Sequence, residues 1–151
     1  MSVRTRIEDA EFLYKNGRKD GALLSILVAL AATSRKRYPK VVKKKDRDAF
    51  TTFLGEELTK RIRVGKFVVK FRNKMILLQD LFYEFVRCEL AHEAQIPKDI
   101  KFTKGDMLHV KVDEKEISLS EKFVDILFDI VIKAEENKEE FKDILEKINQ
   151  S

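Results

Sequence analysis

The stretch LLQDLFYEFVRCELAHEA, residues 77–94, decides the fold that we expect for this chain. Its apolar residues recur at intervals of three and four, and neither Gly nor Pro interrupts them, so the pattern predicts an amphipathic helix. The apolar positions are Leu77, Leu78, Leu81, Phe82, Phe85, Val86 and Leu90. A stripe of this kind buries one face of a helix in the core of a helical domain.

Polar residues interrupt this apolar stripe near its end, at Arg87, Glu89, His92 and Glu93. Arg87 and His92 are five residues apart, which on an α-helix is about 140° around the axis and about 7.5 Å along it. Long side chains from successive turns can therefore reach a common cleft. Positive charge near a helix C-terminus is also favourable without any function, so the spacing alone leaves both interpretations open.

Length and composition predict one cytoplasmic, helix-rich domain over residues 1–151. The sequence is 44% hydrophobic with 11 Phe, and 38% charged with only 5 Gly and 2 Pro. A chain of this length can bury a substantial core. The single cysteine, Cys88, excludes an internal disulfide framework and fits a reducing compartment. The longest apolar run, residues 22–32, is too short to span a bilayer, so we expect no membrane insertion.

The net charge of +5 conceals a division between the two halves of the chain. Residues 1–75 contain 20 Lys/Arg and 8 Asp/Glu, a balance of +12, whereas residues 76–151 contain 11 and 18, a balance of −7. A basic half is typical of proteins that contact polyanions. The acidic half is either solvated or meets the basic half of a second copy.

Helices are expected along most of the chain. Besides residues 77–94, the periodic segments are residues 4–16, 21–36 and 47–63 and, after Ser120, residues 123–132 and 141–148. In the first of these, Phe12 and Leu13 are expected to face the core together with Ile7 and Ala10. Asp20 is expected to cap the second helix, which is apolar nearly all round and therefore predicted to be buried on most sides.

Strands are expected in two places. Residues 64–76 favour a short hairpin that turns at residues 72–74, with a continued helix as the alternative. Beyond the central helix, three short segments alternate apolar and polar residues and predict a small antiparallel β-ribbon: residues 99–102, 107–112 and 116–119. His109 is expected to be exposed on this ribbon.

A basic segment, RKRYPKVVKKKDR at residues 35–47, contains eight Lys/Arg and one acid and is expected to form a loop. It is either a solvated connector or a surface that contacts phosphates. In the second case the predicted RNA-binding residues are Arg35, Lys36, Arg37 and Tyr38, and the tyrosine ring can stack on a base.

Several common catalytic sites have no counterpart in the sequence, which holds neither a GxxxxGK[ST] phosphate loop nor a GxGxxG turn. Two His and one Cys are too few for an ordinary structural zinc site. His92 and Glu89 form a carboxylate–histidine pair three residues apart, but no second Glu-x-x-His occurs. We therefore predict no metal and no cofactor.

Cleavage of RNA by its own 2′-hydroxyl group fits Arg87 and His92 better. This reaction needs an acid or base that titrates near neutrality, which histidine supplies. It also needs a cation for the charge that develops on the phosphorane, and a guanidinium makes two parallel bonds to phosphate.

The segment RCELAHE at residues 87–93, following FYEFV at residues 82–86, resembles the Arg-x4–6-His motif of the HEPN superfamily (higher eukaryotes and prokaryotes nucleotide-binding). Residues 13–39, with an Asn-Gly-Arg turn, an apolar helix and the run TSRKRYP, also resemble uncharacterised bacterial members. The resemblance covers residues 12–96. It implies a mainly α-helical bundle that forms homodimers, here with the β-ribbon inserted before the last helices.

This resemblance implies a metal-independent endoribonuclease of a toxin–antitoxin or defence system, with one motif from each protomer in a composite site. Arg87 and His92 would be catalytic, Glu89 would orient one of them, and the partners would be RNA, a second copy and an antitoxin or other protein. Many active members have a polar residue after the arginine, where this chain has Cys88. The alternatives are a non-catalytic interaction module of the same fold and a nucleotide-binding module with a pocket inside each protomer.

Overall fold

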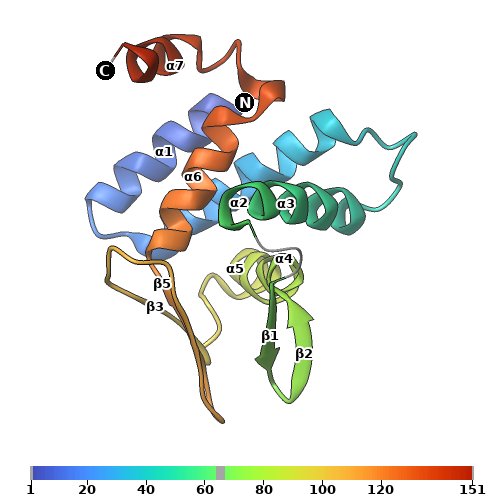
Figure 1. The fold of residues 1–151 in the computed structure, drawn as a ribbon, viewed down its shortest axis with the longest axis vertical. Helices are drawn as coiled ribbons and strands as arrows, with labels where there is room; N and C mark the ends of the chain where they lie inside the picture. Colours follow the sequence, from blue (N-terminus) through green and yellow to red (C-terminus); the bar gives the residue numbers. More distant parts are fainter. Residues whose placement is uncertain (1, 64–66, 151) are drawn as a thin grey trace. The chain divides into compact units, whose positions relative to one another are not determined.

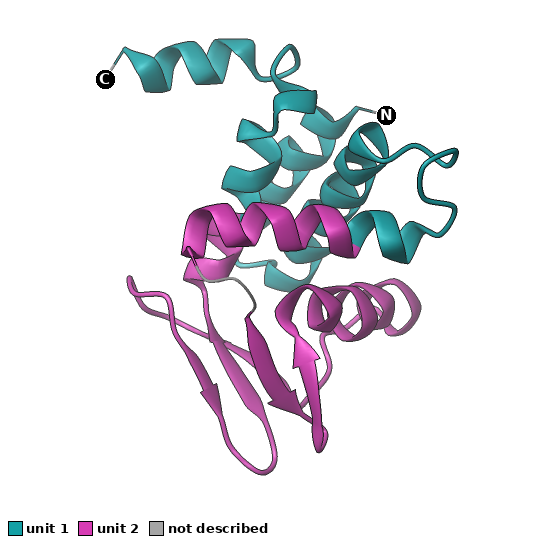
Figure 2. Ribbon diagram, turned by 45° about the vertical axis from the view of Figure 1, so that its right-hand side comes forward, with its two compact units in different colours: residues 1–50, 127–151 teal, residues 51–126 magenta. Residues whose placement is uncertain are grey.

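The computed structural model describes residues 2–63 and 67–150, which are mainly helical with two small sheets (Figure 1). These residues form two compact units (Figure 2). Residues 1–50 and 127–151 make the first unit, and residues 51–126 make the second. The single domain over residues 1–151 stays a prediction. In the described part of the chain, no helix is long and apolar enough to cross a membrane.

The first unit is helical. It contains α1 (Val3–Lys15), α2 (Lys19–Arg37), the start of α3 (Asp46–Ile62), the end of α6 (Lys122–Lys133), the short 3₁₀-helix η2 (Glu135–Asn137) and α7 (Lys142–Asn149). The expected break between the first two helices is present at Asn16 and Gly17. Gly17 adopts a left-handed φ of 74°, and the next backbone N–H, that of Arg18, donates to the carbonyl of Leu13 at 2.8 Å.

The buried face of α1 differs from the expected one. Ile7 and Ala10 are buried as predicted, but Phe12 is 68% exposed, so its predicted place in the core is wrong. The buried stripe follows the helical spacing from Val3 through Ile7 to Ala10. Phe12 lies two residues, or about 200°, beyond Ala10, and therefore points to the opposite side of the helix.

The helix α2 is buried on most sides, as its apolar pattern predicts; its buried apolar residues are Ala22, Leu23, Ile26, Leu27, Ala29 and Leu30. Asp20 is not its N-cap, because the helix starts earlier and Arg18 occupies that position. Asp20 lies instead in the first turn, where a negative charge still complements the helix dipole.

The C-terminal helix α7 is attached to α1 by polar contacts. The Arg4 guanidinium donates to Asp143 Oδ2 at 2.9 Å and to the Glu140 carbonyl at 2.8 Å. The hydrogen bonds from Arg4 to the Asp143 carboxylate are the largest cause that lowers the pKa of Asp143 to about 2. Phe141, just before the helix, is fully buried, whereas no residue of α7 itself is buried.

The second unit begins with the rest of α3 and a β-hairpin. Strands β1 (Val68–Phe71) and β2 (Lys74–Leu77) pair antiparallel, with Phe71 opposite Lys74. Arg72 and Asn73 form the turn with φ values of 51° and 64°, the conformation of a type I′ turn. The predicted hairpin is confirmed for residues 67–76; the predicted residues 64–66 lie outside the described residues.

The predicted central helix is present as one continuous helical segment, but its middle part is π-helical, which was not expected. It consists of α4 (Leu78–Leu81), the π-helical turn η1 (Phe82–Arg87) and α5 (Cys88–Glu93), and it ends at Ala94 with a left-handed φ of 58°. Leu77, its predicted first residue, belongs to β2. π-helical turns are rare in proteins, and many of those that occur lie at functional sites.

The predicted ribbon is a three-stranded mixed sheet of β3 (Ile100–Thr103), β4 (Val110–Val112) and β5 (Ile117–Ser120). Its order is β3-β5-β4, with β3 parallel to β5, so the purely antiparallel ribbon was wrong. The reason is burial. Ile117 and Leu119 are completely buried, which places β5 in the middle, and β3 must then pair with it from the other side.

The core of the second unit is aromatic. Phe123, in α6, is 1% exposed, and its ring lies 6.1 Å from that of Phe67 and 6.5 Å from that of Phe82 between centroids. Ser120 caps the start of α6, because its Oγ accepts a hydrogen bond from the Lys122 N–H at 3.0 Å. The Phe67–Phe123 pair is edge-to-face, and aromatic pairs of this kind stabilise a core beyond their buried area.

Gly55 offers a test of the packing of α3. It lies inside the helix, where glycine costs about 1 kcal/mol relative to alanine. A Cβ at Gly55 would lie 2.8 Å from Gln79 Nε2, which is the far end of a flexible side chain. Gly55→Ala is therefore expected to stabilise the protein by up to about 1 kcal/mol in urea denaturation. A loss of stability that Gln79→Ala does not relieve would contradict this packing.

Candidate functional site around Arg87 and His92

Arg87 and His92 lie on the same helical segment of the second unit, where the π-turn meets α5. Arg87 is the last residue of η1, and His92 is in the last turn of α5. The Arg87 guanidinium carbon is 5.2 Å from the centroid of the Tyr83 ring, in a cation–π contact that fixes its direction. His92 is exposed.

The guanidinium of Arg87 has an unusual hydrogen-bonding state. Its Nε is buried, and no hydrogen-bond acceptor is found for it among the described residues. A buried donor without an acceptor costs about 1–3 kcal/mol, so such groups are rare in folded proteins. Arg87 Nε is therefore a buried donor whose hydrogen-bonding capacity is unused within the described part of the chain.

Glu89 forms an ion pair with Arg72 and not with Arg87. Its Oε1 lies 3.7 Å from Nη2 of Arg72, the first turn residue of the hairpin. The predicted role of Glu89, orienting Arg87 or His92, stays a prediction; the structure gives its carboxylate this ion pair.

Arg72 connects the hairpin with η1, α5 and the turn before β3, and sequence reasoning missed it. Its Nε and Nη2 donate to the Asp99 carboxylate at 2.7 and 2.9 Å. Its guanidinium carbon lies 4.8 Å from the Phe71 ring centroid and 4.9 Å from that of Phe85. The sequence feature that could have revealed Arg72 is the two-residue connection Arg-Asn between two short strands. A type I′ connection of this length requires positive φ at both residues, and this backbone conformation fixes the direction of the arginine side chain.

The Arg72–Asp99 pair predicts a specific pH dependence of stability. The hydrogen bonds from Arg72 hold the pKa of Asp99 below its ordinary value. A lowered folded-state pKa contributes stability that is present above the unfolded pKa and is lost as the pH falls through the folded one.

Asp99→Asn is therefore expected to reduce the free energy of unfolding by up to about 1 kcal/mol at pH 7. The difference from wild type should shrink below about pH 4, the ordinary range for aspartate. Urea denaturation at pH 7 and at pH 3 checks this, and a deficit that is equal at both would contradict it.

The four predicted RNA-binding residues lie in the first unit, and each already has a contact within it. Arg35 donates to Asp46 Oδ1 from Nε and Nη2, at 2.8 and 2.6 Å. Lys36 Nζ donates to Asn137 Oδ1 at 2.8 Å. Arg37 is paired with Glu136 at 2.6 Å, with both side chains less than one-fifth exposed. Lys43 Nζ lies 5.5 Å from the centroid of the Tyr38 ring.

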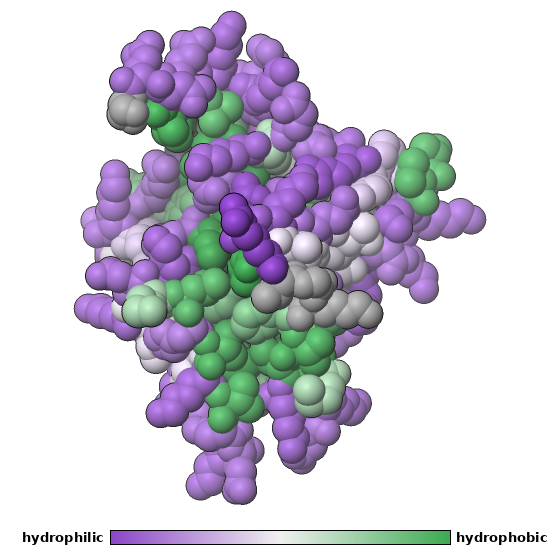
Figure 3. Space-filling model, in the orientation of Figure 1, coloured by the Kyte–Doolittle hydropathy of each residue, from purple (hydrophilic) through white to green (hydrophobic). Residues whose placement is uncertain are grey.

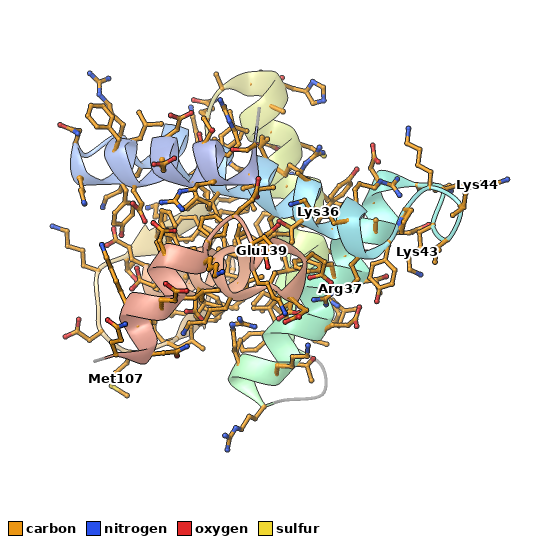
Figure 4. All side chains as sticks on the ribbon, turned by 90° about the horizontal axis from the view of Figure 1, so that it is seen from above. Lys36, Arg37, Lys43, Lys44, Met107 and Glu139 are labelled. Carbon is orange, nitrogen blue, oxygen red and sulfur yellow. The ribbon has the colours of Figure 1, made fainter. Side chains whose placement is uncertain are left out.

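The segment 35–47 that was predicted to be a loop divides into three parts. Residues 35–37 belong to α2 and residues 46–47 belong to α3, so these parts of the loop prediction were wrong, and residues 38–45 form the actual connection between the two helices. Figure 4 shows Lys36 and Arg37 on α2, and Lys43 and Lys44 on the connecting loop. Among the lysines of this loop, Lys40, Lys44 and Lys45 are exposed; on α2, Lys36 is exposed as well, whereas Arg35 and Arg37 are half-buried.

A separate hollow of about 510 Å³ lies in the second unit. Residues of α3, the hairpin and α4 line it, among them Gly55, Thr59, Phe67 and Gln79. Its volume is in the range of small-molecule sites, although its lining offers few charged groups. Among residues 2–63 and 67–150, no group of three or more His, Cys, Asp or Glu side chains could hold a metal ion.

The fold and site define a mainly helical protein with two small sheets and an arginine–histidine pair on a helical segment that contains a π-turn. The model of the Rv1289 family matches residues 2–147. The chain belongs to the Rv1289 family. Comparison with curated proteins found no match, and comparison with solved structures found none either.

Proposed function

We propose that this protein is a metal-independent endoribonuclease of the HEPN type, a toxin or defence effector that acts as a homodimer. The observation that supports this most is the state of Arg87. Its guanidinium is directed by Tyr83, its Nε has no acceptor among the described residues, and an exposed histidine follows five residues later. A phosphate oxygen would supply the missing acceptor once the buried Nε became accessible on RNA binding.

The reaction that these two side chains support is transesterification of a phosphodiester by the neighbouring 2′-hydroxyl of the RNA. The 2′-oxygen loses its proton to a base and attacks the adjacent phosphorus. The bond from phosphorus to the 5′-oxygen breaks, and that oxygen takes a proton from an acid. Arg87 would bind the non-bridging oxygens, whose charge grows in the transition state.

Two proton transfers explain why a homodimer is proposed. An imidazole acts either as base or as acid at one moment, and each chain has one histidine in the motif. Two copies of His92, one from each protomer, would supply the base and the acid together. The two copies of Arg87 would then flank the same phosphate.

The proposal is tested by incubating purified protein with a single-stranded RNA in EDTA. We expect cleavage by the wild type and a loss of at least tenfold in rate with Arg87→Lys, which keeps the charge but removes the paired donors. An unchanged rate with Arg87→Lys would exclude the assigned role of this residue. Intact RNA after incubation with wild type would refute the proposed activity.

A non-catalytic interaction module is the second candidate, and two observations favour it. Glu89 is already paired with Arg72. On the face drawn in Figure 3, apolar residues gather over the strands of the second unit. The exposed apolar residues of those strands include Val68, Met75 and Val112. Exposed apolar patches are typical of protein-binding surfaces.

Light scattering separates the two candidates. If Arg87 and His92 serve only to hold a partner copy, Arg87→Ala should halve the molar mass in solution. If they are catalytic, the mass should stay that of the wild type while the rate of RNA cleavage falls.

A further inference from the structure

The loop between α2 and α3 is held in one shape by a single arginine. Arg35 Nη1 donates to the carbonyls of Tyr38, at 3.2 Å, and Lys43, and Nη2 donates to that of Lys44 at 3.1 Å. The same guanidinium binds Asp46, where α3 begins. All three nitrogens of its guanidinium are therefore directed at the ends of the loop, and the side chain is mostly buried by it.

The loop also has its own backbone hydrogen bonds. The N–H groups of Val42 and Lys43 donate to the Pro39 carbonyl at 2.8 and 3.0 Å, which closes a turn. Val41, at its apex, is 94% exposed. A closed turn clamped by a guanidinium loses less conformational freedom on binding than a free connector would.

The exposed charges of this loop have one sign. Lys40, Lys44 and Lys45 are exposed, whereas the one acid of the segment, Asp46, is neutralised by Arg35. We infer that this loop is a preformed binding surface for the phosphate backbone of single-stranded RNA, with these three lysines as its contacts. Arg35 is its positioning residue and does not contact the RNA. The choice of RNA among polyanions rests on the proposed function.

An anionic membrane is the main rival for a basic loop with an apolar apex. Side chains that anchor loops in a lipid interface are typically Trp, Phe or Leu, and this apex has only Val41 and Val42. Lysines spaced along a turn, in contrast, need nothing further to neutralise a run of phosphates. The loop therefore favours a nucleic-acid backbone.

Binding can be measured separately from cleavage with a 2′-O-methyl oligonucleotide, which lacks the nucleophile. Fluorescence anisotropy with a labelled single-stranded 2′-O-methyl 20-mer in EDTA gives the affinity of the full chain at several salt concentrations. Each phosphate contact on a single strand contributes about −0.7 to the slope of log K against log salt. The triple variant K40Q/K44Q/K45Q is therefore expected to reduce that slope by about 2, with at least a tenfold loss of affinity at 0.1 M salt.

A matched control removes the same charge elsewhere in the first unit. Lys15, Lys142 and Lys147 are exposed, and K15Q/K142Q/K147Q should leave the slope as in wild type. Arg35→Lys keeps the charge but cannot clamp the loop, so it is expected to weaken binding about tenfold. Hydrogen exchange should rise in residues 38–45 of this variant and not in α1, which distinguishes positioning from direct contact.

Three results would overturn the inference: equal slopes for the two triple variants, no measurable binding by wild type, or wild-type affinity and exchange in Arg35→Lys. Binding to phosphatidylserine vesicles that is lost with V41A/V42A, while RNA binding is kept in K40Q/K44Q/K45Q, would assign the loop to membranes. Failure of the proposed function gives a different result. Unmodified RNA would then remain uncleaved in EDTA, while K40Q/K44Q/K45Q would still reduce the salt dependence of binding.

Discussion

Replacing His92 with alanine is expected to lower the rate of RNA cleavage in EDTA by about 10²- to 10⁴-fold, the usual contribution of a positioned general acid or base. In the proposed homodimer the two copies of His92 would act in the same reaction, so one substitution would remove both proton-transfer groups. Because the His92 side chain is exposed, the substitution should leave the thermal midpoint and the molar mass at the wild-type values.

The chain offers a matched control for this substitution. His109 is the other histidine, it is exposed, and its ring hydrogen-bonds to Thr103 Oγ1 at 3.2 Å, which places it on the mixed sheet. His109→Ala should cleave RNA at the wild-type rate. If both variants kept that rate, a contaminating nuclease or a different site would account for the activity.

Replacing Phe123 with alanine is expected to cost about 3–5 kcal/mol of unfolding free energy, the range for a buried phenylalanine. Its ring is 1% exposed and contacts those of Phe67 and Phe82. The substitution leaves a cavity and removes both aromatic contacts. A typical domain has a total stability of about 5–15 kcal/mol, so this loss is a large fraction of the free energy of unfolding and should lower the urea midpoint strongly.

Two further variants show whether the loss of stability comes from the buried position of Phe123 or merely from the removal of a phenylalanine. Phe123→Leu conserves most of the volume and should cost less than about 1.5 kcal/mol. Phe12→Ala removes the same side chain from a position that is 68% exposed and should change stability by less than about 0.5 kcal/mol. Urea denaturation followed by circular dichroism measures all three, and a large loss with Phe12→Ala would contradict the observed exposure of that ring.

The helices could be predicted from the sequence because their apolar residues recur every three or four positions. The hairpin could be predicted because β-forming residues flank a two-residue turn. The parallel pairing of β3 with β5 could not, because it depends on which strand is the most buried. That property is decided by the whole core, and three short strands with similar alternation do not reveal it.

The π-turn before Arg87 was not visible in the sequence either. The same apolar spacing fits an α-helix and a helix that contains one wider turn, so buried positions such as Phe82 and Val86 do not distinguish them. The position of Arg87 relative to the earlier turns therefore could not be derived from an angle of 100° per residue. From Cys88 to Glu93 the α-helical geometry holds.

The candidate site was predictable in its residue types and unpredictable in its contacts. Arg87 and His92 follow from the chemistry of histidine and guanidinium on one helix. The pairing of Glu89 with Arg72 joins residues 17 positions apart, and the clamp that Arg35 forms on the loop depends on carbonyl groups. Neither has a pattern in the sequence, because a run of charges looks the same whether its members bind each other or a ligand.

The most direct test of the proposed activity is the chemistry of the RNA ends that the wild-type protein produces in EDTA. Attack by the 2′-oxygen leaves a 2′,3′-cyclic phosphate on one product and a 5′-hydroxyl on the other. Mass spectrometry of a cleaved oligoribonucleotide should show both ends, and a 2′-O-methyl group at the cleaved position should prevent cleavage there. Products with 5′-phosphate ends, or cleavage that appears only when Mg²⁺ is added, would contradict the proposed site.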